Sequence, residues 1–214
     1  EESKDKLIAS FLETRMFGQD KVDRMVRLSK INTLLIGGNI ENIFIGNSIS
    51  EHTKIDYLKD SVDLIFTNPP FGAEYNYNDL IEGDFELLGQ LSCQTTNICS
   101  ELLMLLKCLS LLKPNGKLVI VLPDSVFSAK GLNAQVRNLI LSHFKINAVI
   151  EMPAVTFAQA GTRTKTSILY LTKTAPNTEN KITMAICNDI GYTVKERIGV
   201  PVKITSGINE MNKV

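Results

Sequence analysis

The sequence has little of what would mark a metal-binding, secreted or membrane protein. Its four cysteines, at positions 93, 99, 108 and 187, form no Cys-x-x-Cys pair, and only two histidines could supplement them. This spacing argues against zinc, so we expect no metal site and reduced thiols in a cytoplasmic protein. No apolar run approaches the roughly 20 residues that cross a bilayer. The first six residues, Glu-Glu-Ser-Lys-Asp-Lys, are unlike a signal peptide.

The chain also lacks a net charge, because 23 Lys and Arg residues balance 23 Asp and Glu residues. With no excess of basic residues, a DNA or RNA substrate would need a local basic patch or a partner subunit. Internal repeats and low-complexity tracts are absent from the sequence as well. What remains, 214 residues of which 44% are hydrophobic and 21% charged, is the composition of one soluble globular domain.

Apolar residues recur with helical spacing in some segments and form short runs in others. The helical spacing predicts helices over about 4–13, 22–36, 97–113 and 132–143. The short runs predict strands at about 15–17, 43–45, 62–67, 117–122, 146–152, 166–172 and 182–187.

Two segments between and after these elements are polar. Residues 72–96 contain glycines and few periodic apolar positions, which predicts a long loop or lid, and the sequence after 187 is polar with glycines. Strands that alternate with helices predict an α/β fold with a doubly wound, mostly parallel, Rossmann-like sheet. We expect the strand at 62–67 to be buried in it.

The most informative stretch is Asn68-Pro69-Pro70-Phe71, at the end of that strand. In open α/β sheets, ligands bind at the carboxyl ends of the strands. The prolines fix φ and lack an N–H, so the turn presents its carbonyls instead of entering a helix. The Asn68 side-chain oxygen, a backbone carbonyl and the Phe71 ring predict a clamp for a planar molecule with an exocyclic amine. The alternative is a plain Asx-Pro turn.

Two more polar turns follow predicted strands. Asp20 ends the first recognisable strand, where doubly wound nucleotide-binding folds place a carboxylate that accepts hydrogen bonds from ribose hydroxyls. Asn47, in the turn Gly46-Asn47-Ser48, ends the next, where a side-chain oxygen could meet an adenine amino group. Asp20 could instead cap the helix that begins near Val22. The order of the three turns favours a cofactor site.

Together with later segments, these turns resemble the amino-methyltransferases that use S-adenosyl-L-methionine. The resemblance is closer to the N6-adenine DNA methyltransferase subunits, or modification subunits, of type I restriction-modification systems. It is carried by Gly18-Gln19-Asp20 with residues 27–37, by Gly46-Asn47-Ser48, by residues 68–71, and by segments 112–124, 149–157 and 165–169. The last three segments are the most distinctive, and the resemblance covers nearly the whole chain.

The resemblance implies a role for each residue of the tetrapeptide. The amine of a flipped adenine would face the Asn68 side-chain oxygen and the Pro69 carbonyl, which localise its lone pair for attack on a sulfonium methyl group. Pro70 completes the catalytic turn, and Phe71 would stack on the extruded base. Asp20, Asn47 and Ser48 would then bind the cofactor, S-adenosyl-L-methionine.

Three later residues are implied as substrate-binding. Phe157 would meet the opposite face or edge of the base, although a core aromatic is an equal interpretation. Arg163 and Lys165 would touch DNA phosphates, although surface cations are as often simply solvated. The implied partners are double-stranded DNA, a DNA-specificity subunit and a restriction subunit.

The sequence departs from the family at its start. Family members carry a glycine-rich turn after the first, central strand, upstream of the acidic position, and this chain begins too late to include it. We therefore expect an incomplete sheet and a fragment that is inactive alone, with 1–175 as part of the catalytic domain and 176–214 as its C-terminal extension. The rival interpretations are an RNA guanine-N2 or protein glutamine methyltransferase, or a non-catalytic assembly module.

Overall fold

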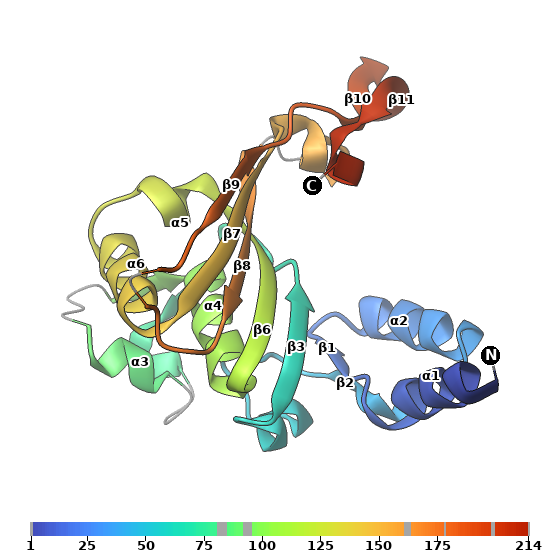
Figure 1. Cartoon of the computed structure of the whole chain (residues 1–214), viewed down its shortest axis with the longest axis horizontal. Coiled ribbons are helices and arrows are strands. Elements are labelled where there is room, and N and C mark those ends of the chain that lie inside the picture. The colour runs from blue at the N-terminus through green and yellow to red at the C-terminus, as the bar shows by residue number, and fades with distance from the viewer. Residues whose placement is uncertain are drawn as a thin grey trace.

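A five-stranded sheet forms the centre of the protein (Figure 1). The computed structural model describes residues 2–80, 85–91, 96–160, 164–177, 179–197 and 200–213. The strand order is β3 (Val62–Thr67), β6 (Leu112–Pro123), β8 (Thr166–Thr172), β7 (Lys145–Met152) and β9 (Thr183–Ile186). Pairs β3–β6 and β7–β9 are parallel, whereas β8 is antiparallel to both of its neighbours. Four strands thus share one direction, which confirms the α/β class with a mostly parallel sheet.

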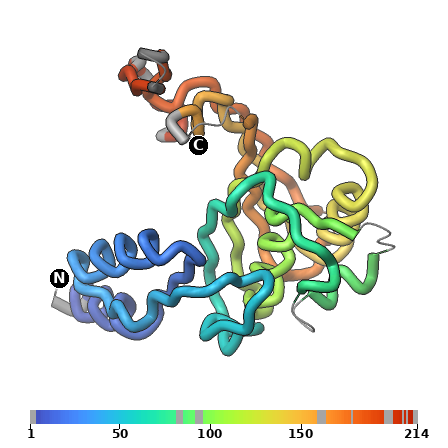
Figure 2. The backbone as a smooth tube through the Cα atoms, turned by 180° about the vertical axis from the view of Figure 1, so that it is seen from behind, coloured from blue at the N-terminus to red at the C-terminus, as the bar shows by residue number. Residues whose placement is uncertain are grey.

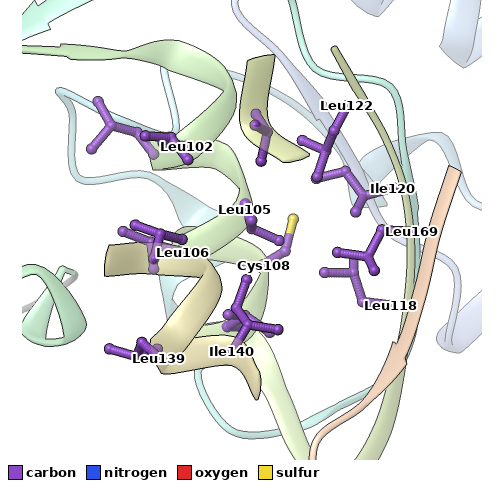
Figure 3. Close-up of a cluster of buried hydrophobic side chains, with 14 of the residues drawn as sticks. Leu102, Leu105, Leu106, Cys108, Leu118, Ile120, Leu122, Leu139, Ile140 and Leu169 are labelled. Atoms are coloured by element: carbon purple, nitrogen blue, oxygen red, sulfur yellow. The ribbon is translucent and has the colours of Figure 1, made fainter. Parts of the chain in front are cut away.

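The main core lies between this sheet and the helices α4 (Ser100–Leu111) and α6 (Leu132–His143). Figure 3 shows Leu105 and Cys108 of α4 pointing toward Leu118 and Leu169 of the sheet. Leu105 and Leu118 are fully buried, and each such side chain contributes about 1.5–3 kcal/mol relative to an exposed one. A short helix, α5 (Asp124–Ser128), joins β6 to α6.

A second, smaller sheet carries the amino-terminal helices. Its strands β1 (Gly18–Asp20) and β2 (Ile43–Ile45) are parallel, and they are flanked by α1 (Glu2–Thr14), α2 (Asp23–Leu35) and the 3-10 turn η1 (Ile40–Asn42). Figures 1 and 2 show this lobe beyond β3, at the edge of the larger sheet. Within the described part of the chain, the two sheets share no strand pair. This separation agrees with the expected incomplete sheet.

The prediction that β3 is buried was wrong. In the five-stranded sheet β3 is an edge strand, with Leu64 47% and Phe66 70% exposed. A short run of β-branched and aromatic residues predicts a strand, but it does not say whether a neighbour covers each face. The first strand was also placed too early, because β1 is Gly18–Asp20 and not 15–17.

The predicted loop over 72–96 contains regular structure. It begins with β4 (Glu74–Asn76) and η3 (Tyr77–Asp79) and includes α3 (Glu86–Gly89), while 81–84 and 92–95 lie outside the described residues. Strand β4 pairs antiparallel with β5 (Asn97–Cys99). Because β5 takes residues 97–99, the helix predicted from 97 begins at Ser100.

The polar tail forms a hairpin that the sequence did not predict. Strands β10 (Ile190–Arg197) and β11 (Val200–Asn209) are antiparallel and are followed by η5 (Glu210–Lys213). The Tyr192 hydroxyl donates to the Thr156 carbonyl at 3.0 Å, which ties the hairpin to η4 (Ala154–Ala160) after β7. None of the helices in the described ranges is long and apolar enough to span a membrane.

Candidate active site

The turns that follow β1, β2 and β3 line a cleft of about 410 Å³. Asp20, Asn47 and Ser48 contribute to one part of its lining, and the four residues Asn68 to Phe71 contribute to another. Phe157, which is almost 90 residues later in the sequence, lines the same cleft. The structure therefore brings together the predicted tetrapeptide, the three predicted cofactor residues and one of the three predicted substrate residues.

Asn68 and Pro69 carry two hydrogen-bond acceptors that no group among the described residues uses. Asn68 is exposed, and the described residues supply no hydrogen bond to its side-chain amide or to the Pro69 carbonyl. The next carbonyl is different, because Pro70 O accepts a hydrogen bond from the Ser100 hydroxyl at 2.9 Å. The turn is thus anchored through Pro70, while the acceptors of the two preceding residues remain available to a ligand with N–H donors.

Phe71 and Phe157 form an aromatic pair. Their ring centroids lie 5.7 Å apart and their planes are 88° from parallel, an edge-to-face contact. Such pairs contribute about 0.5–1.5 kcal/mol beyond the apolar area they bury. Phe157 is half-buried on η4, so it is a wall of the cleft and also part of the packing beside it.

Asp20 shapes the turn before α2 and leaves one carboxylate oxygen without a partner among the described residues. Its Oδ1 accepts the Val22 backbone N–H at 2.7 Å. Val22 is itself the residue that caps α2, and the first turn of that helix receives no side-chain cap. Asp20 therefore orders the entry to α2 without serving as its N-cap, and its Oδ2 can accept hydrogen bonds from a ligand.

Asn47 and Ser48 are held by an internal network. The Asn47 side-chain oxygen accepts the Ile49 N–H at 3.1 Å, and its amide donates to the Tyr75 hydroxyl at 3.3 Å. Gln19 donates to the Ser48 hydroxyl at 2.5 Å. These bonds fix Asn47 with one lone pair of its oxygen still available, and they connect the β1 and β2 turns to each other and to β4.

The two basic residues predicted to touch phosphates do not both fall in the described part of the chain. Arg163 lies outside the described residues. The Lys165 ammonium is 2.6 Å from Glu151 Oε1 on β7, and the hydrogen bond that it donates to the Glu151 carboxylate raises the pKa of Lys165 above its usual value. Lys165 is thus neither simply solvated nor free, because an ion pair holds it at the end of the sheet.

Several cleft residues were missed by the sequence analysis. Tyr75 and Met104 line the cleft, while Ser100 bonds Pro70 of the tetrapeptide and Glu101 bonds Gly72, the residue that follows it. Tyr75 lies in the segment that was interpreted as a loop, and the other three lie in a helix whose apolar spacing indicates only packing. Among the described residues, no group of three or more His, Cys, Asp or Glu side chains is arranged to hold a metal ion.

Sequence comparisons with known proteins show which family this chain resembles. The sequence profile described as N-6 DNA Methylase matches residues 4–197. The chain is 27% identical over 168 residues to the methylase subunit of the type I restriction enzyme EcoEI of Escherichia coli, which covers 78% of this chain and 32% of that protein. It is 26% identical over 161 residues to the StySPI methylase subunit of Salmonella potsdam, covering 73% and 28%.

Solved structures give the same result for the fold. A type I restriction-modification methyltransferase subunit from Streptococcus thermophilus superimposes with a TM-score of 0.64 at 21% identity, covering 94% of this chain and 42% of that one. The M protein of the type I enzyme EcoKI gives 0.60 at 21% identity, covering 80% and 33%. The chain spans 28–32% of the length of the two curated relatives named above. Because the family profile matches most of its residues, this chain belongs to the N-6 DNA methylase family.

Proposed function

We propose that this chain is the catalytic part of an enzyme that transfers a methyl group from S-adenosyl-L-methionine to the exocyclic N6 of adenine in DNA, within a type I restriction-modification system. The observation that carries the proposal is the pair of acceptors on Asn68 and Pro69, which line a cleft at a strand end and have no hydrogen-bond partner within the described ranges. A ligand with two N–H hydrogens on one nitrogen matches two acceptors on adjacent residues.

The chemistry follows from the weak nucleophilicity of an aromatic amine, whose lone pair is delocalised into the ring. When the Asn68 oxygen and the Pro69 carbonyl accept its two N–H groups, they orient the nitrogen and favour the charge that develops on it. S-adenosyl-L-methionine supplies an electrophilic sulfonium methyl group when bound. As the amine nitrogen gains positive charge, its N–H groups become more acidic. The Asn68 and Pro69 acceptors would keep these N–H groups hydrogen-bonded until one proton is lost to solvent.

The donor set of the cleft fits this cofactor. Asp20 Oδ2 can accept hydrogen bonds from the ribose hydroxyls, and the Asn47 oxygen can accept one from the adenine amino group. Ser48 holds the second turn in register with the first through Gln19. Met25 and Ile49 add apolar surface to the cleft lining, which suits the flat faces of a purine.

A base that is to be methylated must leave the duplex and needs stacking partners in its place. Phe71 and Phe157 offer two rings at right angles, one for a face and one for an edge of the base. Lys165 is paired with Glu151, and we propose that a DNA phosphate would compete with the Glu151 carboxylate for its ammonium group. Arg163 is proposed as the second phosphate contact.

We further propose that the partners are double-stranded DNA, a DNA-specificity subunit and a restriction subunit. One structure similar in fold belongs to a study of complex assembly in a type I restriction-modification system, and another, the type ISP enzyme LlaBIII, is bound to DNA. The zero net charge supports a division of DNA contacts among subunits.

Within the chain, residues 1–175 would form the catalytic part and 176–214 its extension. Free thiols at Cys99, Cys108 and Cys187 suit the cytoplasm.

The test is a methyl-transfer assay on the full-length protein with tritium-labelled S-adenosyl-L-methionine and DNA, ribosomal RNA or protein as acceptor. We expect label in DNA as N6-methyladenine. Asn68→Ala should lower kcat by about 10²–10³-fold, the usual effect of removing one oriented group at a reacting centre, with cofactor affinity unchanged. Asn138→Ala, an exposed asparagine on α6, is the matched control. Label in RNA or protein instead, or undiminished turnover by Asn68→Ala, would overturn the proposal.

A further inference from the structure

Two buried polar residues lie directly behind the tetrapeptide, at the start of α4. Ser100 is 0% and Glu101 6% exposed, and both belong to the first turn of a helix that otherwise packs leucines into the core. Buried polar side chains are costly unless they are hydrogen-bonded, so their partners show what they do. Those partners belong to the chain around Phe71, about 30 residues earlier.

Three backbone groups of the turn are held by these two residues. The Ser100 hydroxyl donates to the Pro70 carbonyl at 2.9 Å, and the Ser100 N–H donates to the Ala73 carbonyl at 2.7 Å. Glu101 Oε2 accepts the Gly72 N–H at 3.3 Å. The peptide groups on both sides of Phe71 are therefore fixed to α4.

The Ser100 hydroxyl also lies 3.0 Å from Glu101 Oε2. Its single hydrogen is therefore shared between the Pro70 carbonyl and the carboxylate, which joins the serine and the glutamate into one unit. The Glu101 carboxylate, in turn, accepts the Gly72 N–H of the turn.

The turn needs this support on its downstream side. Pro69 and Pro70 restrict φ before Phe71, but Gly72 has a φ of +77°, and a Cβ built there would meet no atom within 4 Å. No proline ring restrains φ at Gly72, and the space beside its Cα is open. The bond to Glu101 supplies the missing restraint, and Asn68 and Pro69 line the cleft on the other side of Phe71 in the sequence.

We propose that Ser100 and Glu101 are positioning residues for methyl transfer: they hold the Pro70–Gly72 backbone so that the acceptors of Asn68 and Pro69 and the ring of Phe71 keep their places in the cleft. This inference rests on the proposed function of the tetrapeptide. A displacement of about 1 Å at a reacting centre costs on the order of 10²-fold in rate, so a loosened turn should lower kcat far more than it lowers binding.

The experiment compares Ser100→Ala, Glu101→Gln and Glu101→Ala with Ser110→Ala in the full-length protein. Ser110 is the matched control, because its hydroxyl donates to the Lys107 carbonyl at 2.8 Å at the other end of the same helix. Turnover on unmethylated plasmid DNA, KM for that DNA, the Kd for S-adenosyl-L-methionine by calorimetry, and thermal unfolding are measured for each. Hydrogen exchange of the 71–76 segment is followed in parallel and does not depend on activity.

We expect Ser100→Ala to lower kcat by about 10- to 100-fold with KM and Kd within about twofold, and Ser110→Ala to leave kcat within about twofold. Glu101→Gln keeps an acceptor for the Gly72 N–H and should lose less than Glu101→Ala. Exchange at 71–76 should accelerate in Ser100→Ala and Glu101→Ala only. Equal losses in Ser100→Ala and Ser110→Ala, or unchanged exchange at 71–76, would overturn the inference. If the wild-type protein labels no DNA, the proposed function is refuted. The exchange measurement would still decide whether Ser100 and Glu101 hold the Pro70–Gly72 backbone.

Discussion

Gly46 allows a direct test of how the proposed cofactor side of the cleft is built. A Cβ placed on Gly46 would lie 2.6 Å from Thr53 Cγ2, a distance that real Cβ contacts do not show, and 3.4 Å from Thr53 Cβ. Thr53 cannot easily move away, because its N–H donates to Asp56 at 2.7 Å at the start of η2 (Lys54–Leu58). We therefore expect Gly46→Ala to lower the free energy of unfolding by about 1–3 kcal/mol, the usual cost of overpacking.

The source of that cost can be isolated with Thr53→Ser. Serine keeps the hydroxyl and the backbone bond to Asp56 and removes only the methyl group that clashes. In a double-mutant cycle measured by urea unfolding, Gly46→Ala should therefore cost less in the Thr53→Ser background, with a coupling energy of about 0.5–3 kcal/mol. The same pair should be followed in the full-length protein by calorimetry with S-adenosyl-L-methionine, since a displaced turn moves Asn47. An equal cost of Gly46→Ala in both backgrounds would refute the reasoning.

Three further predictions follow from single features. Asp20→Ala in the full-length protein should weaken S-adenosyl-L-methionine binding by roughly tenfold or more in calorimetry, because a hydrogen bond to a charged group is lost; an unchanged Kd would mean that Asp20 only orders the turn before α2. Burial raises the pKa of Cys108 to about 12, so between about pH 9 and 12 the unfolded chain releases a thiol proton that the native state keeps. The free energy of unfolding should then fall by about 1.4 kcal/mol per pH unit more steeply in the wild type than in Cys108→Ala, and parallel urea-titration slopes would contradict this. Phe66, 70% exposed on the edge strand β3, should promote self-association of this chain, and Phe66→Lys should shift the sedimentation profile toward monomer.

The strand-end turns could be predicted from the sequence because their signals are local. The prolines of residues 69–70 and the apolar run before them mark a strand end without reference to the rest of the chain. The helix over 132–143 and the strand over 166–172 were placed at their observed bounds, since their periodicity is strong and breakers flank them. The convergence of Asp20, Asn47 and Asn68 on one cleft followed from a general rule about sheet edges.

The features that the sequence did not predict depend on contacts between distant segments. The direction of β8 and the exposure of β3 are set by neighbouring strands that no local pattern encodes. Residues 74–76 and 97–99 are each too short to show period two, and they are strands only because they pair with each other. The roles of Ser100 and Glu101 could not be predicted for the same reason, since their hydrogen-bond partners lie about 30 residues away in the sequence.

The hydrogen bond between the Asn47 amide and the Tyr75 hydroxyl has a mechanical meaning, because it joins two sides of a cleft whose sheets share no strand pair among the described residues. A second tie is the edge contact of Phe17 with Tyr57, whose ring centroids are 6.2 Å apart. No strand pair among the described residues joins the two sheets, so these side-chain contacts supplement the chain segment that runs from β2 to β3. A small molecule seated between Asp20 and the proline turn would complete the span, so that occupancy of the cleft and rigidity of the amino-terminal lobe would rise and fall together.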